Sequence, residues 1–265
     1  MVRRARLDAE LVRRGLARSR EHAASVIASG HVRVGGLVAT KAASGVDDGT
    51  SIVVDEGAAD TYVSRGAHKL TGALDAFPVL DVTGRRCLDA GASTGGFTDV
   101  LLRRGAAQVV AVDVGYGQLA WSLRSDDRVV VLDRTNVRAV TADAVGGPVD
   151  LVVGDLSFIS LVTVLPALVG VCTPEGDLLL MVKPQFEVGR ARIGSGGVVR
   201  DPQLRVESVV TVARAARDLG LGMAGVVASP LPGPAGNVEY FLWLCADAPP
   251  MDESAVRAAV EAGPQ

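Results

Sequence analysis

One lysine stands where its side chain could carry out acid–base chemistry. In "LLLMVKPQFEVG", Lys183 directly follows an apolar run, and Pro184 comes next. Such a run between turn-forming residues is typical of a buried parallel strand, and a residue before proline is biased toward an extended backbone. We therefore expect Lys183 to stay in line with the strand and to face the cleft at its end. The alternative is an ordinary solvated strand end.

A lysine in that position could remove a proton from a poorly nucleophilic hydroxyl. It acts as a base only if a useful fraction is neutral near the working pH. A second cation or burial favours the neutral amine, whereas carboxylates favour the charged one. Lys69 in "RGAHKL" is a candidate cation, and Asp155 in "GDLSFIS" and Glu239 in "GNVEYFLWL" are carboxylates beside apolar runs. The sequence leaves open which effect is larger.

A glycine-rich turn indicates a cofactor. "CLDAGASTGGFT", residues 87–98, reads as a strand, a turn and a helix start, and Asp113 closes the next strand 22 residues after Gly91. A nucleotide can approach the backbone at such a turn, and the carboxylate can bind two ribose hydroxyls. Ser93 replaces the middle glycine of the dinucleotide motif, where a side chain would crowd a pyrophosphate. S-adenosylmethionine has no phosphate and is our prediction, with a nicotinamide cofactor or a plain structural turn as alternatives.

The cofactor residues predicted from this reading lie in the turn and at the following strand ends: Gly91, Ser93, Thr94, Gly95, Gly96, Asp113, Asn136 and Asp155. The segment after Asp155 loosely resembles the Asp/Asn-Pro-Pro-Tyr loop of enzymes that methylate base amino groups, but it lacks both prolines. Phe158 in this segment is either a core aromatic or a residue that stacks on a base.

The elements that must position these residues alternate along the chain. From residue 64 onward, apolar strand-like runs are separated by helical stretches of about ten residues, which indicates a mostly parallel sheet with right-handed crossovers. Ligands bind outside the carboxyl ends of the strands in such sheets. We predict an α/β fold, with a Rossmann-like S-adenosylmethionine-dependent methyltransferase sheet over residues 64–248 and a C-terminal tail over 249–265.

A separate small α+β domain is predicted over residues 1–58, followed by a linker at 59–63. Gly15 looks like the end of a first helix and Ser19 like the N-cap of a second. "HVRVGGLV" reads as a strand that continues into a Gly-Gly turn, and "SIVV" reads as another short strand. The apolar residues that recur at helical spacing are Leu7, Leu11, Leu16, Ala23, Ala24, Ile27 and Ala28.

The charge of the chain is unevenly distributed. Residues 1–41 carry nine Lys and Arg against three Asp and Glu, whereas the rest carries 18 against 27. A basic head on an acidic body suggests binding to a polyanion, most often a nucleic acid. The residues predicted to contact RNA are Arg4, Arg6, Arg18, Arg20, Arg65, Phe158 and Arg190.

Composition narrows the class of protein further. The three cysteines lie far apart without CxxC spacing, so we expect neither a disulfide framework nor a metal site. The longest apolar run, residues 161–172, is too short to span a bilayer and contains Pro166. The N-terminus lacks the apolar core of a signal peptide. We expect a soluble, cytoplasmic, monomeric protein.

Two resemblances make these expectations more specific. "RLDAELVRRGLARSREHAASVIASGHVRVGGLV" resembles the small RNA-binding domain of ribosomal protein "S four" type. Lys69, Asp155, Lys183 and Glu239 resemble, in order and setting, the K-D-K-E set of the FtsJ-like RNA ribose 2′-O-methyltransferases. With "DAGASTGGFT", "DLSFISL" and "VKPQFEVG", the whole chain resembles the TlyA (hemolysin A) family.

The resemblance implies S-adenosylmethionine-dependent 2′-O-methylation of cytidine in ribosomal RNA, with those four residues catalytic. It also implies activity on the small and large ribosomal subunits and an effect on susceptibility to capreomycin-type antibiotics. Asp60 and Tyr62 stand in the linker where mycobacterial members have Arg and Trp, which puts any signalling through the linker in doubt.

Three other functions remain as alternatives. The family name suggests a membrane-lytic toxin, against which the lack of a spanning segment counts. A non-catalytic RNA-binding assembly factor is opposed by the complete K-D-K-E set, and methylation of a base amino group by the missing prolines.

Overall fold

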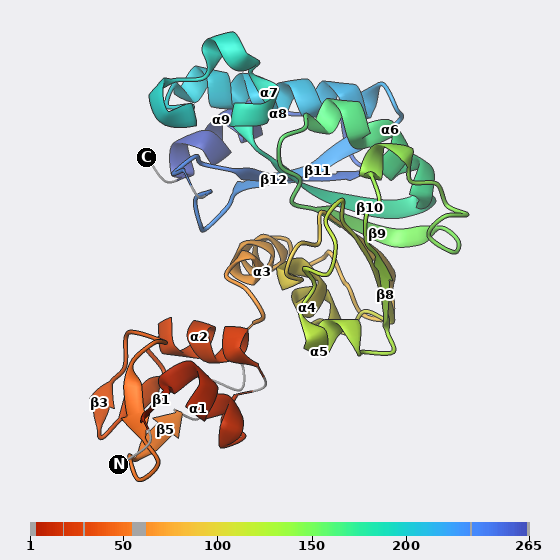
Figure 1. Cartoon of the computed structure of the whole chain (residues 1–265). Helices are drawn as coiled ribbons and strands as arrows, with labels where there is room; N and C mark the ends of the chain where they lie inside the picture. Colours follow the sequence, from red (N-terminus) through yellow and green to blue (C-terminus); the bar gives the residue numbers. More distant parts are fainter. Residues whose placement is uncertain (1–3, 18, 29, 55–61, 234, 264–265) are drawn as a thin grey trace. The chain divides into compact units, whose positions relative to one another are not determined.

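The chain divides into two compact units, Met1–Ser64 and Arg65–Gln265. The structure, a computed structural model, describes residues 4–17, 19–28, 30–54, 62–233 and 235–263 (Figure 1). The predicted linker therefore lies largely outside the described residues, Asp60 included.

The N-terminal unit combines two short helices with two small antiparallel sheets. α1 (Leu7–Arg13) packs against α2 (Arg20–Ala28) and against the paired strands β1 (Arg4–Arg6) and β4 (Gly45–Asp47). The second sheet has the order β3-β2-β5. These strands are β2 (Val32–Val34), β3 (Leu37–Val38) and β5 (Ile52–Val54), with the predicted Gly-Gly turn between β2 and β3. The core consists of Leu7, Leu11, Ala17, Ala23, Val26, Ile27, Val32 and Val46.

The predicted breaks between the helices are confirmed, and Leu16 lies outside the core despite its helical spacing. Gly15 has a φ of +71° after the end of α1, and the backbone N–H of His22 donates to Oγ of Ser19 at the start of α2. Leu16 lies after this break rather than in the helix, and it is 36% exposed. Its helical spacing from Leu11 therefore does not bring it into the core.

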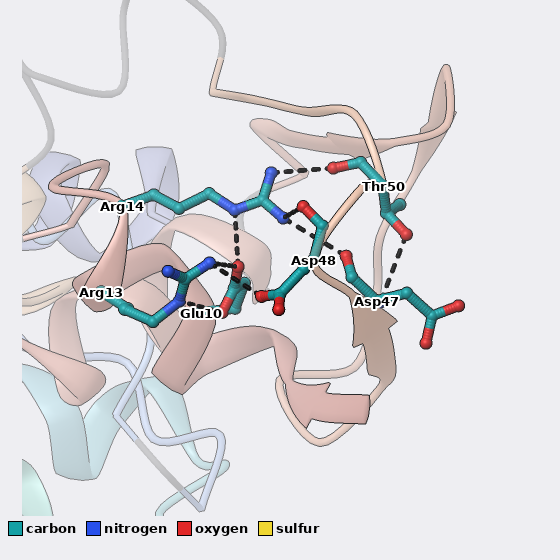
Figure 2. A network of polar contacts seen from close by, with 6 residues as sticks. All are labelled: Glu10, Arg13, Arg14, Asp47, Asp48 and Thr50. Carbon is teal, nitrogen blue, oxygen red and sulfur yellow. Dashed lines mark hydrogen bonds and ion pairs between the residues drawn. The ribbon is translucent and has the colours of Figure 1, made fainter. Parts of the chain in front are cut away.

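A buried carboxylate ties α1 to the β4–β5 turn (Figure 2). Glu10 is 1% exposed and accepts hydrogen bonds from Arg13 and from Nε of Arg14. The guanidinium of Arg14 also donates to the backbone carbonyls of Thr50 and Asp48, at 2.8 and 2.9 Å. The two arginines hold the pKa of the Glu10 carboxyl down, at about 2. Both are thus part of the framework of this unit.

The C-terminal unit is built on a seven-stranded sheet in the order β11-β12-β10-β9-β6-β7-β8. β10, β9, β6, β7 and β8 are parallel, and β12 runs antiparallel to both of its neighbours. The strands are β6 (Arg86–Ala90), β7 (Gln108–Val112), β8 (Val129–Leu132), β9 (Val149–Gly154), β10 (Cys172–Val182), β11 (Gly222–Ala228) and β12 (Tyr240–Cys245). This mixed α/β sheet confirms the predicted fold class.

Helices cover both faces of the sheet (Figure 1). One face carries α3 (Gly66–Ala76), α4 (Gly96–Arg103) and α5 (Trp121–Arg124). The other carries α6 (Leu161–Val171), α8 (Pro202–Arg217) and α9 (Glu253–Ala262), whose apolar residues share one core with the sheet. With both faces covered, the inner strands can be almost wholly apolar. The remaining short elements are η2 (Val137–Ala139), α7 (Pro184–Glu187), η3 (Arg190–Arg192) and η4 (Ser195–Gly197).

In the part of the chain that the structure describes, no helix is both long enough and apolar enough to cross a bilayer.

Candidate active site

Four charged side chains from distant parts of the sequence meet at one edge of the large sheet. Nζ of Lys69 lies 2.5 Å from Oε2 of Glu239 and 3.9 Å from Oδ2 of Asp155. Nζ of Lys183 lies 2.6 Å from Oδ1 of Asp155. The structure thus brings together all four residues of the predicted K-D-K-E set, with Asp155 between the two lysines.

The sheet register explains this arrangement. Val182 pairs with Tyr240, so Lys183 and Glu239, one residue beyond each, are neighbours across β10 and β12. Asp155 directly follows β9, which is parallel to β10 and lies on its other side. Lys69 comes from the first turns of α3. Lys183 has φ −111° and ψ 103°, which confirms the expected extended backbone before Pro184.

The four groups are largely withdrawn from water. Lys69, Lys183 and Glu239 are 6%, 7% and 1% exposed. A charge buried to this degree is tolerated only when it is paired, and each of these is. Oε1 of Glu239 has no hydrogen-bond partner among the described residues, and a Cβ at Gly233 would lie 2.5 Å from it. Glycine at position 233 therefore lets the backbone cover this carboxylate.

A cavity of about 440 Å³ ends at Asp155. Such a volume suits a small organic cofactor. Of the predicted cofactor residues, five line the cavity: Gly91, Ser93, Asp113, Asn136 and Asp155. Apolar walls come from Val112, Val114, Val137, Leu156 and Ile159.

The glycine-rich turn is held by the acidic residue at the end of β7. The backbone N–H groups of Ser93 and Gly115 donate to the two carboxylate oxygens of Asp113, at 2.8 and 2.7 Å. Ser93 has a φ of +49°, a left-handed conformation that costs roughly 1–2 kcal/mol for a residue other than glycine. The bond from Asp113 thus holds the turn in a strained shape beside the cavity. Each carboxylate oxygen keeps acceptor capacity for a ribose hydroxyl.

Three predicted cofactor residues do not line the cavity: Thr94, Gly95 and Gly96. Gly95 has a φ of +98°, and a Cβ there would clash with Cδ1 of Leu123. The N–H of Ala120 donates to the carbonyl of Thr94. This half of the glycine-rich segment therefore packs the start of α4 against the segment that follows β7.

Two functional candidates escaped the sequence analysis. Asp89 is fully buried in β6 just before the turn, where its Oδ2 accepts a hydrogen bond from Thr98, and burial raises its pKa to about 7. Ser157 lines the cavity, and its Oγ lies 2.9 Å from Nζ of Lys183. The signal for Ser157 in the sequence was its position two residues after Asp155.

The aromatic side chain beside the site lies at the surface. Phe158 is 91% exposed, adopts a φ of +64° and lies 5.4 Å from the ring of Phe186, measured between centroids. Its assignment as a core aromatic is therefore wrong, and an aromatic face is left open at the cavity.

The arginines predicted to contact RNA differ in their ion pairs and in their exposure. Arg6 and Arg20 both pair with the buried Asp8, at 2.9 and 3.0 Å, yet their side chains are 53% and 60% exposed. Arg4 is 76% exposed and lies 3.5 Å from Asp47. Arg65 is exposed just before α3. Arg18 and the side chain of Arg190 lie outside what the structure describes.

Comparisons with known proteins agree over most of the chain. Residues 62–246 match the FtsJ-like methyltransferase family, and residues 5–52 match the S4 domain. The chain is 67% identical over 244 residues to the 16S/23S rRNA (cytidine-2′-O)-methyltransferase TlyA of Mycobacterium tuberculosis strain CDC 1551 / Oshkosh, which covers 92% of this chain and 91% of that protein.

Two further relatives extend the comparison. The chain is 44% identical over 240 residues to YqxC of Bacillus subtilis strain 168, a candidate rRNA methyltransferase, with 90% of this chain and 85% of that protein covered. The solved structure of a candidate hemolysin from Streptococcus thermophilus superposes with a TM-score of 0.74 at 38% identity, covering 98% of this chain and 96% of the other.

Proposed function

The chain belongs to the FtsJ-like methyltransferase family, in the TlyA group that also carries an S4 domain, and on that premise we propose that it methylates the 2′-hydroxyl of cytidine in ribosomal RNA. The observation that carries the proposal is Asp155 paired with two buried lysines at the end of a cofactor-sized cavity. The lysines supply a proton acceptor next to the place where the methyl group would arrive.

S-adenosylmethionine fits the groups that line the cavity. Asp113 would accept hydrogen bonds from its ribose hydroxyls, and the apolar walls beside Asn136 would enclose its adenine. Ser93 crowds no phosphate, because this cofactor has none. When bound, it supplies an electrophilic methyl group on a sulfonium sulfur.

The residues of the chain would then remove one proton, that of the ribose hydroxyl. Lys183 would accept the proton of the ribose hydroxyl on Nζ when that hydroxyl is methylated, provided that the amine is unprotonated. Asp155 orients Lys183 and balances its positive charge after the transfer. Lys69 pairs with Glu239 and also approaches Asp155. The Lys69–Glu239 pair would therefore help to hold the carboxylate of Asp155 in place.

The N-terminal unit would supply most of the affinity for RNA. Arg6 and Arg20 share a single carboxylate, so their combined charge stays positive, and both side chains are largely exposed. Together with Arg4, Arg18, Arg65 and Arg190 they would bind phosphates, and Phe158 would stack on a base. We extend the proposal to both ribosomal subunits in the cytoplasm and to an effect on capreomycin-type antibiotics.

The direct test is to map the methylated nucleotides. Purified small and large subunits are incubated with the protein and S-adenosylmethionine carrying a labelled methyl group, and the ribosomal RNA is digested to nucleosides. We expect label in 2′-O-methylcytidine. Label only in a methylated base would contradict the proposal, and label in one subunit alone would restrict it to that subunit.

The role of Lys183 is tested by Lys183→Arg. Arginine keeps the positive charge but does not deprotonate near neutral pH, so methyl transfer should be abolished while cofactor and subunit binding survive. Lys41→Ala, a surface change in the N-terminal unit, should keep the chemical step and serves as the control. A single-turnover rate for Lys183→Arg within about threefold of wild type, under about 1 kcal/mol of barrier, would show that Lys183 is not the base.

A further inference from the structure

Lys183 has a second partner besides Asp155. Oγ of Ser157 lies 2.9 Å from Nζ of Lys183, and Asp155 approaches the same nitrogen at 2.6 Å. Asp155 and Ser157 both belong to the segment that follows β9, and both side chains approach Nζ of Lys183. Ser157 also lines the cavity, so its hydroxyl lies where the cavity meets the paired lysine.

Two partners constrain an amino group in a way that one cannot. Nitrogen in a lysine has four tetrahedral directions, of which one is the bond to Cε. The ion pair with Asp155 alone would let the amino group rotate or tilt, because an ion pair does not fix the directions of the N–H bonds. The hydrogen bond to Ser157 fixes one of these directions, and the two contacts together restrict the remaining one. In the neutral amine this direction holds the lone pair that must receive the proton.

The chemical nature of the second acceptor matters as much as its position. A carboxylate favours the charged lysine, because a hydrogen bond between ions is roughly twice as strong as a neutral one. A second carboxylate would therefore hold the amine in the form that cannot act as a base. A serine hydroxyl accepts an N–H bond and brings no charge. It can orient Lys183 at a smaller cost to the neutral form.

We propose that Ser157 is a positioning residue for the methyl transfer: it holds the amino group of Lys183 so that the lone pair points to the ribose hydroxyl. This inference rests on the proposed function, in which Lys183 is the base. It adds a fifth member to the four charged residues, and it gives the hydroxyl at the end of β9 a role apart from cofactor binding.

The experiment compares Ser157→Ala, Ser157→Cys and Ser157→Thr in the full-length protein, with ribosomal subunits and saturating S-adenosylmethionine. Alanine removes the acceptor, cysteine keeps the size but is a weak acceptor, and threonine keeps the hydroxyl. Single-turnover methylation should fall about 10- to 100-fold for Ala and Cys, as expected when a reacting group loses its alignment. Threonine should restore the rate to within about threefold of wild type.

A second readout separates positioning from a general structural effect. Loss of an acceptor makes the protonated amine less favourable, so the acidic limb of the pH–rate profile should move to lower pH in Ser157→Ala and stay in place in Ser157→Thr. Affinity for cofactor and for subunits, measured by calorimetry and filter binding, should stay within about twofold, which also shows that the variants are folded.

Ser160→Ala is the matched control from the same segment. Its hydroxyl accepts the N–H of Val162 at the start of α6 and donates to Glu187, and Lys183 is not among the partners of its side chain. This variant should lower thermal stability through loss of the helix cap, while its pH–rate profile keeps the wild-type shape.

The outcomes distinguish this inference from the function on which it rests. If Lys183→Arg is inactive but Ser157→Ala keeps the wild-type rate and pH profile, the positioning role of Ser157 is overturned and the proposed function stands. The positioning role is also overturned if threonine does not restore activity that alanine has lost. If Lys183→Arg remains active, or wild type forms no 2′-O-methylcytidine, the proposed function itself fails.

Discussion

At the scale of single residues, Asp113 joins the shape of the cofactor cavity to its chemistry. Its carboxylate already accepts two backbone N–H groups, one of them from the strained Ser93. A substitution there would therefore act twice, by removing an acceptor for the ribose and by releasing the turn that lines the cavity. These two effects can be separated because only the second changes the protein in the absence of cofactor.

We expect Asp113→Ala to weaken binding of S-adenosylmethionine by about 1–3 kcal/mol, the range for lost hydrogen bonds to a charged group. Calorimetry on the purified variant measures this. Asp126→Ala, which removes a carboxylate paired with Arg128 away from the cavity, should leave the affinity unchanged. An unchanged affinity for a folded Asp113→Ala variant would remove Asp113 from the cofactor site.

The residues that could be predicted from the sequence were those whose position is fixed by a strand end. Lys183 and Asp155 follow apolar runs, and the carboxyl ends of parallel strands share one edge of a sheet. Glu239 precedes β12, whose antiparallel direction brings its first residue to that edge. Their pairing with Lys69 depended on a resemblance, because nothing local links a helical lysine to a strand over a hundred residues away. Ser157 could not be singled out, since a serine in a turn has many ordinary roles.

At the scale of elements, the network around Glu10 makes α1 and the β4–β5 turn depend on one another. The sequence showed a basic N-terminal segment and favoured binding to a polyanion. It could not show that Arg14 donates to the backbone carbonyls of Asp48 and Thr50 or that Arg13 pairs with the side chain of Asp48, because these contacts need a distant turn, 35 residues away in the case of Arg13 and Asp48. The short strands β1 and β4 were also missed, because three residues carry no periodic pattern.

This network predicts a pH dependence for the stability of the N-terminal unit. The pKa of Glu10 is lowered from 4.5 to about 2, chiefly by Arg13 and then by Arg14. A lowered pKa means that the stabilising contribution is complete above the unfolded value of 4.5 and is lost as the pH falls through about 2. Glu10→Gln should therefore destabilise the unit by a constant amount above about pH 5, and by progressively less below it.

The difference in stability between wild type and Glu10→Gln is measured at each pH by hydrogen–deuterium exchange of the amides in α1 and β4 of the full-length protein. Glu207→Gln, which removes an exposed carboxylate paired with Arg192 in the other unit, is the control and should not change exchange in α1. Equal protection of wild type and Glu10→Gln at pH 7 would show that the buried carboxylate does not stabilise the unit.

At the scale of the whole molecule, we expect the basic N-terminal unit to bind RNA and the other unit to carry out the chemistry. The catalytic unit has its own core and holds all residues of the cavity and of the charged set. Exposed arginines gather in the other unit, even though Asp8 offsets part of the charge of Arg6 and Arg20. Loss of the N-terminal unit should therefore abolish affinity for RNA, whereas the catalytic unit alone should keep its affinity for the cofactor.

Deletion of residues 1–60 should leave a folded protein that binds S-adenosylmethionine with nearly unchanged affinity. Binding to ribosomal subunits should collapse, and its dependence on salt should become shallower, because fewer counterions are released when fewer phosphates are contacted. Affinity and salt slope are measured by filter binding over a range of salt concentrations. If both stay at the wild-type values, the N-terminal unit does not supply the affinity for RNA.

The position of β12 has a consequence for how the enzyme is made. Among the described strands β12 comes last in the sequence, yet it is inserted between β10 and β11, and Glu239 directly precedes it. Until it is in place, β10 presents an open edge, and open apolar edges promote aggregation of nascent chains. A chain cut short before residue 239 would keep the glycine-rich turn and Asp113 but would leave Lys69 without Glu239, the nearer of its two carboxylate partners. The charged set should therefore be completed only when β12 has paired with β10, so that a correctly assembled sheet is a condition for activity.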